Sequence, residues 1–151
     1  MKTTVKVKKF SPAAILPHRA TESAAGADLH ACIAEPVVIA PGQTVKIGTG
    51  LAVEVPPGYA AFLYGRSGLG VNHGLAPANC VGVCDADYRG EICIGLHNHS
   101  SQPFTVQPQD RIAQMVIAPV LEAVFEEAEE LSDTQRGTGG FGSTGMIGGA
   151  Q

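Results

Sequence analysis

A first candidate for chemistry is the sequence GRSGLG at residues 65–70, directly after the apolar run YAAFLY. A strand that turns sharply at glycine into a short helix would expose backbone N–H groups, and Ser67 could cap that turn. Arg66 adds a fixed guanidinium fork, so the segment suits the binding of a phosphate group. A surface turn that carries an arginine is the simpler interpretation, and the GxxxxGKS/T pattern of a Walker loop is absent.

A second candidate lies in NCVGVCDADYRGEICIG at residues 79–95, which indicates a hairpin with two apolar arms around a polar turn. Asp85 ends the first arm, and a carboxylate there could orient and deprotonate a water molecule. Turn formation alone is the simpler explanation of this aspartate. Tyr88 is harder to explain by a tight polar turn, because its ring is better suited to stacking on a flat ligand or a sugar.

Two further segments place polar side chains on expected strands. Asp28 lies in AAGADLHA, and a carboxylate on a mostly apolar strand needs an arginine or the water shell of a metal as its partner. The segment DRIAQMVI at 110–117 carries Asp110, Arg111 and Gln114. A structural aspartate–arginine pair would account for the last segment without any ligand.

The glycine-rich sequence RGTGGFGSTG at residues 136–145 combines flexibility with specific side chains. Glycine lets a backbone approach phosphate closely. Arg136 adds a charged donor, Phe141 could stack on a base, and Ser143 and Thr144 add hydroxyl groups. The residues alone therefore indicate a phosphorylated ligand that contains a ring, without selecting the base.

The elements that must position these residues are mostly short strands. The chain has 151 residues, which predicts a single domain, and glycine and proline (19 and 10 residues) recur at short intervals between apolar runs. Many short strands with frequent turns predict a sandwich or a closed barrel. Residues 120–131, VLEAVFEEAEEL, differ because their apolar residues follow helical spacing, so the local pattern predicts a helix. After about residue 132 the composition is that of a flexible tail.

Composition excludes several classes of function. The net charge of −4 and the scattered lysine and arginine residues argue against binding to nucleic acid. No apolar run is long enough to span a membrane, and the N-terminus lacks a secretory signal, which predicts a cytoplasmic protein. Its four cysteines are then expected to be reduced and buried, with no CxxC pair among them. The His97-x-His99 pair lacks a third ligand, so polar residues at a strand end are a simpler explanation than a zinc site.

Taken together, five of these stretches resemble the five motifs of the trimeric deoxyuridine triphosphatase (dUTPase) family. They are AGADLHA, GRSGLG, NCVGVCDADYRG, DRIAQMVI and RGTGGFGSTG, which occur in this order between about residue 10 and residue 145. The resemblance implies an all-β, jelly-roll-like β-barrel of the β-clip type that assembles as a homotrimer with an exchanged C-terminal arm. It divides the chain into a barrel at residues 1–131 and an arm at 132–151. It also implies a short helix near 67–72 and a strand, in place of the locally predicted helix, at 120–128.

The activity that the resemblance implies is hydrolysis of dUTP to dUMP and pyrophosphate, which limits uracil in DNA and supplies dUMP for dTMP synthesis. Asp85 would activate a water molecule for in-line attack on the α-phosphorus. Tyr88 would press against the sugar and exclude a ribose 2′-hydroxyl. Asn79 and the following backbone would bind uracil and leave no room for the methyl group of thymine.

The remaining implied roles concern the phosphate chain and its metal. Asp28 would order water molecules around Mg²⁺, which keeps several waters and takes oxygen ligands from phosphate. Phe141 would cover the uracil. Phosphate contacts are implied for Arg66, Ser67, Gly68, Gln114, Arg136, Ser143 and Thr144.

Two positions depart from the family pattern. Cys84 stands where an aliphatic residue is usual, either as a packing substitute or as an oxidisable thiol, and we favour packing. Gln109 replaces a glycine that shapes a turn.

A dCTP deaminase on the same fold is a rival interpretation, but the DADYRG turn has the dUTPase form. A non-enzymatic regulatory module is another, but Asp85 and the tail, which it could lose without penalty, are both present.

Overall fold

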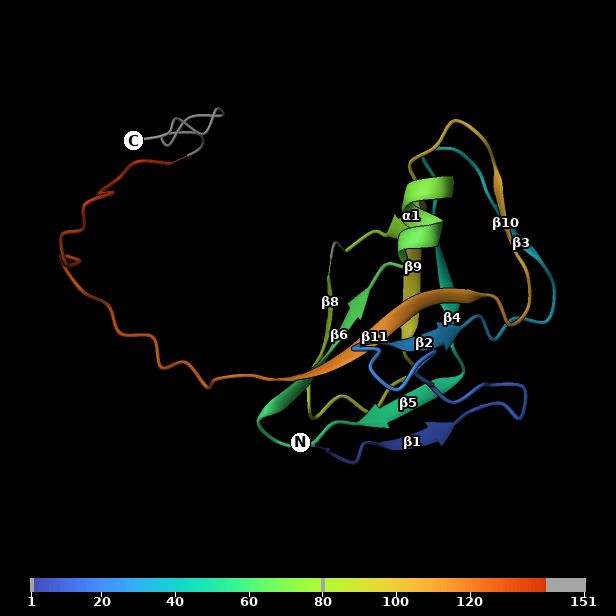
Figure 1. Cartoon of the computed structure of the whole chain (residues 1–151), viewed down its shortest axis with the longest axis horizontal. Coiled ribbons are helices and arrows are strands. Elements are labelled where there is room, and N and C mark those ends of the chain that lie inside the picture. Colours follow the sequence, from blue (N-terminus) through green and yellow to red (C-terminus); the bar gives the residue numbers. More distant parts are fainter. Residues whose placement is uncertain (1, 80, 141–151) are drawn as a thin grey trace.

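The computed structural model describes residues 2–79 and 81–140, and its regular structure is almost entirely β (Figure 1). Within the described residues the only helix is α1 (Ser67–His73), and no helix is long and apolar enough to span a membrane. The predicted all-β class is therefore confirmed as a mostly β fold with one short helix. The strands, in chain order, are β1 (Lys6–Lys9), β2 (Ala27–His30), β3 (Val37–Ile39), β4 (Thr44–Gly48), β5 (Leu51–Glu54), β6 (Tyr59–Tyr64), β7 (Leu75–Pro77), β8 (Gly82–Cys84), β9 (Cys93–Asn98), β10 (Phe104–Val106) and β11 (Arg111–Pro119).

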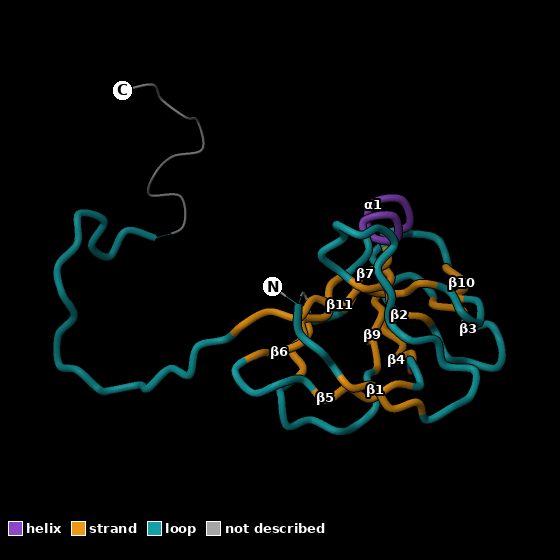
Figure 2. Tube along the Cα trace, turned by 60° about the horizontal axis from the view of Figure 1, so that its bottom comes forward, coloured by secondary structure: helices purple, strands orange, loops and turns teal. Residues whose placement is uncertain are grey.

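The strands form four antiparallel sheets. The largest has the order β2-β11-β6-β8, a second has the order β4-β9-β7, and two further pairs are β1-β5 and β10-β3. Figure 2 shows the strands gathered into one body, with α1 at its edge and residues 120–140 extending away from it. Most pairs join strands that are far apart in the sequence, so the fold depends on long-range contacts.

One apolar core lies between these sheets. Along β9 the burial alternates residue by residue, as expected for a strand with one face toward the core. Leu29 on β2, Ile47 on β4 and Leu96 on β9 are at most 1% exposed, so different sheets contribute to the same interior. Each such side chain stabilises the fold by about 1.5–3 kcal/mol through burial.

The short helix predicted near residues 67–72 is present as α1, but Ser67 does not cap it. Arg66 occupies the N-cap position, no side chain makes a capping hydrogen bond, and Ser67 is the exposed first residue of the helix. The helix ends at Gly74, whose positive φ of 65° allows its N–H to donate to the carbonyl oxygen of Gly70. The hydroxyl of Ser67 is thus exposed at the start of the helix.

The two arms expected to form a hairpin belong to different sheets. β8 pairs with β6, whereas β9 pairs with β4 and β7, and the two arms do not pair with each other in the structure. The hairpin prediction is wrong in this respect because each arm finds a different long-range neighbour. The turn between the arms is held to a third strand, since the N–H of Ile92 donates to the carbonyl oxygen of Leu51 (2.8 Å).

Residues 120–131 form neither the helix that their spacing predicts nor the strand that the family resemblance implies. No regular structure follows Pro119 up to Gly140, where the description ends. Leu121, Val124 and Phe125 are 96%, 92% and 94% exposed. Both predictions are wrong for the single chain because helices and strands gain most of their stability from packing, and here the apolar side chains contact no other element.

One turn carries an unusual backbone conformation. Gln109 has φ of 67°, and it is the only residue other than glycine with a positive φ in the described part of the chain. Its N–H donates to the carbonyl oxygen of Ala31 (2.9 Å), and the N–H of Gln107 donates to Oδ2 of Asp110 (2.8 Å). These bonds hold Gln109 in a conformation that costs an L-residue about 1–2 kcal/mol.

Replacing Gln109 with glycine should therefore stabilise the protein. We expect Gln109→Gly to raise the free energy of unfolding by about 0.5–1 kcal/mol, because relief of strain exceeds the entropy that glycine loses on folding. Gln107→Gly, in the same turn at a negative φ, should lower it. Urea unfolding of both variants measures the two effects, and a loss of similar size in both would show that Gln109 is not strained.

Candidate functional site

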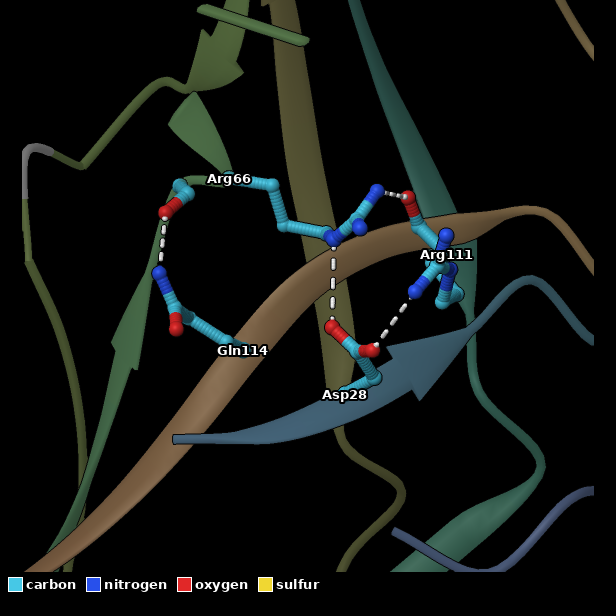
Figure 3. Close-up of polar contacts among 5 residues, drawn as sticks. Asp28, Arg66, Arg111 and Gln114 are labelled. Carbon is cyan, nitrogen blue, oxygen red and sulfur yellow. Dashed lines mark hydrogen bonds and ion pairs between the residues drawn. The ribbon is translucent and has the colours of Figure 1, made fainter. Parts of the chain in front are cut away.

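The buried carboxylate of Asp28 is bound by two arginine side chains (Figure 3). Nε of Arg66 lies 3.1 Å from Oδ1, and Nη1 of Arg111 lies 3.2 Å from Oδ2, while only 11% of the Asp28 side chain is exposed. The partner that the sequence required for Asp28 is thus a pair of arginines. Arg111 pairs with Asp28 and not with its neighbour Asp110, which instead accepts a backbone hydrogen bond.

Three adjacent strands bring these residues together. β11 lies between β2 and β6, and Gln114 on β11 is opposite both Asp28 and Tyr64. Nε2 of Gln114 donates to the carbonyl oxygen of Gly65 (2.9 Å), which ties β11 to the start of the GRSGLG segment. A β-carbon at the neighbouring Gly26 would clash with Oε1 of Gln114, so the Gln114 side chain would have to shift.

A pocket of about 370 Å³, here called the arginine pocket, opens beside this cluster. Asp28 contributes one negative charge and the two arginines two positive charges, so these three side chains carry a net charge of +1 that favours an anion. The lining residues are Ala20, Ala24, Ala25, Gly26, Asp28, Arg66, Ser67, Gly68, Arg111 and Gln114. Four of the predicted phosphate contacts therefore line one pocket.

The imidazole of His30 lies near this cluster and faces His18, with ring centroids 5.6 Å apart. Burial lowers the pKa of His30, and the neighbouring His18 lowers it further. Since the unperturbed value is 6.5, His30 is neutral at pH 7 and does not add to the charge of the arginine pocket. Its buried Nδ1 has no hydrogen-bond partner within the structure described.

A second pocket of about 320 Å³, here called the tyrosine pocket, contains Asn79, Asp85 and Tyr88. Asp85 is exposed at the end of β8. The ring of Tyr88 is about half exposed (47%), and its hydroxyl donates to the carbonyl oxygen of Glu91 (3.0 Å). Gly90 is needed under that ring, because a β-carbon there would clash with the Tyr88 hydroxyl. The tyrosine is therefore held in place while one side of it remains accessible.

Three residues of the tyrosine pocket with ionisable side chains were not predicted from the sequence, namely Lys46, Glu91 and Cys93. Lys46 comes from β4, which pairs with β9, so only the sheet register could have shown that it lies near Asp85. Cys84 lines the same pocket and is buried. Burial, and then the charge of Asp85, raise the pKa of the Cys84 thiol, so this thiol stays protonated and fits the packing interpretation.

The arginine and tyrosine pockets share no lining residue in the single chain. The strand register explains the separation, because Cys84 lies opposite Ala61 near the beginning of β6, whereas Arg66 follows the end of β6. From the level of Asp85, one residue beyond Cys84, to Arg66 the distance along the strand is about 20 Å at 3.3–3.4 Å per residue. One chain therefore places Asp85 far from Arg66 along the strand, although Leu63 of the tyrosine pocket lies only three residues before Arg66.

The predicted contacts of the tail are only partly described. Nε of Arg136 donates to the carbonyl oxygen of Gly139 (2.8 Å), and Arg136 lines neither pocket. Phe141, Ser143 and Thr144 lie outside the described residues.

The His97-x-His99 pair shows no metal cage. Nδ1 of His97 shares a hydrogen bond with the hydroxyl of Thr44 (2.8 Å), and the two imidazole rings contact each other edge to face at 4.3 Å. Among residues 2–79 and 81–140, no group of three or more histidine, cysteine, aspartate or glutamate side chains could hold a metal ion.

Comparison with known proteins identifies close relatives. The model of the dUTPase family matches residues 13–145. Proteins named deoxyuridine 5′-triphosphate nucleotidohydrolase from Neisseria meningitidis serogroup A and Desulfitobacterium hafniense are 50% and 54% identical. The first alignment covers 94% of this chain and 95% of the relative, and the second covers 87% of each.

Solved structures agree with the sequence matches. The dUTPase of Staphylococcus bacteriophage 80alpha with dUPNHPP has a TM-score of 0.86 and 30% identity, covering 95% of this chain and 99% of that one. A mutant dUTPase of phage phi11, described as revealing the coordination of a structural Mg(II) ion, has a TM-score of 0.78 and 26% identity. That alignment covers 87% of this chain and 100% of the phage chain.

The ion pairs of Asp28 should matter for stability. Asp28→Asn removes the negative charge and leaves two guanidinium groups close together, so we expect a loss of about 1–3 kcal/mol in the free energy of unfolding. The matched control is Glu54→Gln, which breaks the ion pair with Lys6 (3.0 Å) and should cost much less, because both side chains are exposed to solvent. Denaturant unfolding compares the two variants, and equal effects would show that the Asp28 cluster does not stabilise the fold.

Proposed function

The chain belongs to the dUTPase family, and from this premise we propose that it hydrolyses dUTP to dUMP and pyrophosphate. The observation that carries the proposal is its identity of about 50%, over nearly the whole length, to relatives named for this activity. The two pockets supply the chemistry that the reaction needs. One is cationic and lined by glycine and hydroxyl groups, and the other combines a carboxylate with an accessible aromatic ring.

Asp85 is the proposed catalytic residue. Its exposed carboxylate in the tyrosine pocket orients a water molecule and accepts a proton as the water oxygen attacks the α-phosphorus. The bond between this phosphorus and the oxygen that bridges to the β-phosphorus then breaks, and pyrophosphate leaves. The high pKa of the adjacent Cys84 keeps that thiol neutral, so it does not compete as a nucleophile.

The tyrosine pocket is the proposed site for the nucleoside. Tyr88 is held by its bond to the Glu91 carbonyl and presents its ring to the sugar, where it leaves no room for a 2′-hydroxyl. Asn79 offers both a donor and an acceptor to uracil. Support for this assignment is that Asn79, which precedes β8, lines one cavity with Asp85 and Tyr88 from the turn after β8.

The arginine pocket is the proposed site for the phosphate chain. Arg66, Ser67, Gly68 and Gln114 line it, and the backbone and hydroxyl donors at the start of α1 can approach an anion closely. From the tail, Arg136 would add a charged donor, and Ser143 and Thr144 would add hydroxyl donors. Phe141 would cover the uracil.

The described residues fit Mg²⁺ bound mainly by the substrate. They include no protein cage of three ligands, and Mg²⁺ commonly takes phosphate oxygens and waters instead. Each carboxylate oxygen of Asp28 accepts one guanidinium bond and retains a lone pair that a metal-bound water could use. When bound, the ion would neutralise charge on the triphosphate.

Assembly as a homotrimer with exchanged C-terminal arms is part of the proposal. Within one chain the level of Asp85 and Arg66 lie about 20 Å apart along β6, so a site that uses both needs parts of neighbouring copies. The outer face of the largest sheet also exposes apolar side chains, among them Tyr64 and Val83. Such a face is typical of an interface.

We propose that residues 120–131, which end the barrel part of the chain, dock on a neighbouring copy, and that residues 132–151 form the exchanged arm. The exposed apolar side chains of residues 120–131 need a partner surface, and their glutamates give the segment a negative charge. β1 carries Lys6, Lys8 and Lys9, and its outer edge has no strand partner in the described structure. A neighbouring copy thus offers complementary charge and a free strand edge. We propose the barrel and the arm as the two parts of the chain, with their boundary near residue 131.

The activity is tested with Mg²⁺ and, separately, dUTP, dCTP, dTTP and UTP. We expect release of pyrophosphate from dUTP alone, and Asp85→Asn should lower kcat at least about 100-fold because proton transfer is lost. Asp87→Asn, exposed in the same turn but outside the tyrosine pocket, is the matched control and should retain nearly full activity. Ammonia release from dCTP, or an active Asp85→Asn variant, would overturn the proposal.

The arm is tested by two truncations. A chain ending at Gln135 should form trimers but hydrolyse dUTP at least tenfold more slowly, because the tail closes the site without holding the copies together. A chain ending at Pro119 should also lose the trimer. Light scattering and pyrophosphate release measure both properties. Full activity of the first truncation would show that the tail is only a linker.

A further inference from the structure

We propose that Arg111 binds the phosphate chain of the substrate directly, as a second guanidinium group beside Arg66. The inference deepens the proposed dUTP hydrolysis and rests on it. The family resemblance gave no role to Arg111, and its simplest interpretation from the sequence was a structural pair with Asp110. In the structure Arg111 pairs with Asp28 instead of Asp110, and it shares this carboxylate with Arg66 (Figure 3).

An irregularity in β11 directs Arg111 into the arginine pocket. Side chains three residues apart on a regular strand point to opposite faces, so Arg111 and Gln114 should diverge. The pairing with β2 instead shifts register between Arg111 and Ala113, which makes Ile112 an extra residue. Ile112 and Ala113 are both buried in succession, and Arg111 and Gln114 then line the same pocket. Such bulges re-aim side chains next to active sites.

The charge of Arg111 is not cancelled within the cluster. Asp28 is the one carboxylate that pairs with both arginines in the described structure, so one positive charge of the three-residue cluster is left for a ligand. The arginine charge is permanent. A polyanion such as a phosphate chain is the chemical class that fits this excess.

Arg111 is also the more available of the two guanidinium groups. Its side chain is 48% exposed, against 25% for Arg66. Arg66 uses Nε for Asp28 and Nη1 for the carbonyl oxygen of Arg111. Among the described residues the Arg111 side chain donates a hydrogen bond from Nη1 alone, which leaves Nε and Nη2 for phosphate oxygens.

This geometry allows a variant that removes the charge of Arg111 and keeps the hydrogen bond that holds Arg66. Arg66 is held by the main-chain carbonyl of Arg111, so replacing the side chain at this position keeps that contact. Arg111→Met retains much of the aliphatic stem and removes the charge. Arg111→Lys keeps a charge without the two-pronged donor.

The experiment measures binding of deoxyuridine, dUDP and inorganic pyrophosphate by calorimetry with Mg²⁺ present, together with steady-state hydrolysis of dUTP. In Arg111→Met we expect affinity for dUDP and pyrophosphate to fall at least about tenfold, with deoxyuridine binding unchanged. Arg111→Lys should recover part of the loss, and KM for dUTP should rise more than kcat falls. Lys2→Met, an exposed charge change elsewhere, should match the unaltered protein.

Two outcomes would overturn the proposal. One is that Arg111→Met binds dUDP and pyrophosphate as tightly as the unaltered protein. The other is an equal loss for deoxyuridine and dUDP accompanied by a lower unfolding temperature, which indicates a structural role. Failure of the unaltered protein to hydrolyse dUTP would instead refute the proposed function, and binding of pyrophosphate would still report on Arg111.

Discussion

The buried carboxylate of Asp28 is the constraint on which the arginine pocket depends. A charge that is removed from water must be paired, and here the pairing needs one arginine after β6 and another at the start of β11. The cluster can form only when β2, β11 and β6 lie side by side in that order. Local sequence can therefore make the turn of the GRSGLG segment, but the orientation of Arg66 is a property of the folded sheet. The same ion pairs that satisfy Asp28 fix the cationic surface beside Ser67 and Gly68.

The same sheet also explains why one chain has two incomplete sites. β6 has β11 on one side and β8 on the other, so it is connected to both groups of candidate residues. Antiparallel pairing places the end of β8 near the beginning of β6, and Asp85 is thereby directed away from Arg66. The strand register separates Asp85 from Arg66 by about 20 Å along β6, and no rearrangement of side chains removes this separation. An assembly that joins the pockets of different copies is a solution that leaves the sheet intact.

Sequence predicted the elements whose signals are local. The short apolar runs between glycines and prolines predicted the mostly β class correctly, and the glycine turn of the GRSGLG segment agrees with the helix α1 that follows it. The errors concern partners that are distant in the sequence. Arms expected to pair with each other found different sheets, and Ser67 proved to be the first residue of α1 rather than its cap. The pairing of Arg111 with Asp28 has no local signal either, because it depends on a one-residue shift in a ladder between strands over eighty positions apart.

Residues 120–131 show the same dependence on distant partners, here on partners outside the single chain. Their apolar residues have helical spacing, yet they lie exposed and without regular structure because nothing in the described part of the chain covers them. Three other features also lack a partner in the described part of the single chain. They are the free edge of β1, the apolar outer face of the largest sheet and the two separated pockets. The proposed trimer would complete all of them at once. Burial of residues 120–131 would then contribute to assembly. Assembly would bring Asp85 of one copy to the arginine pocket of another. The free energy of association would then also assemble the active site. Hydrolysis should therefore depend on protein concentration wherever the trimer dissociates.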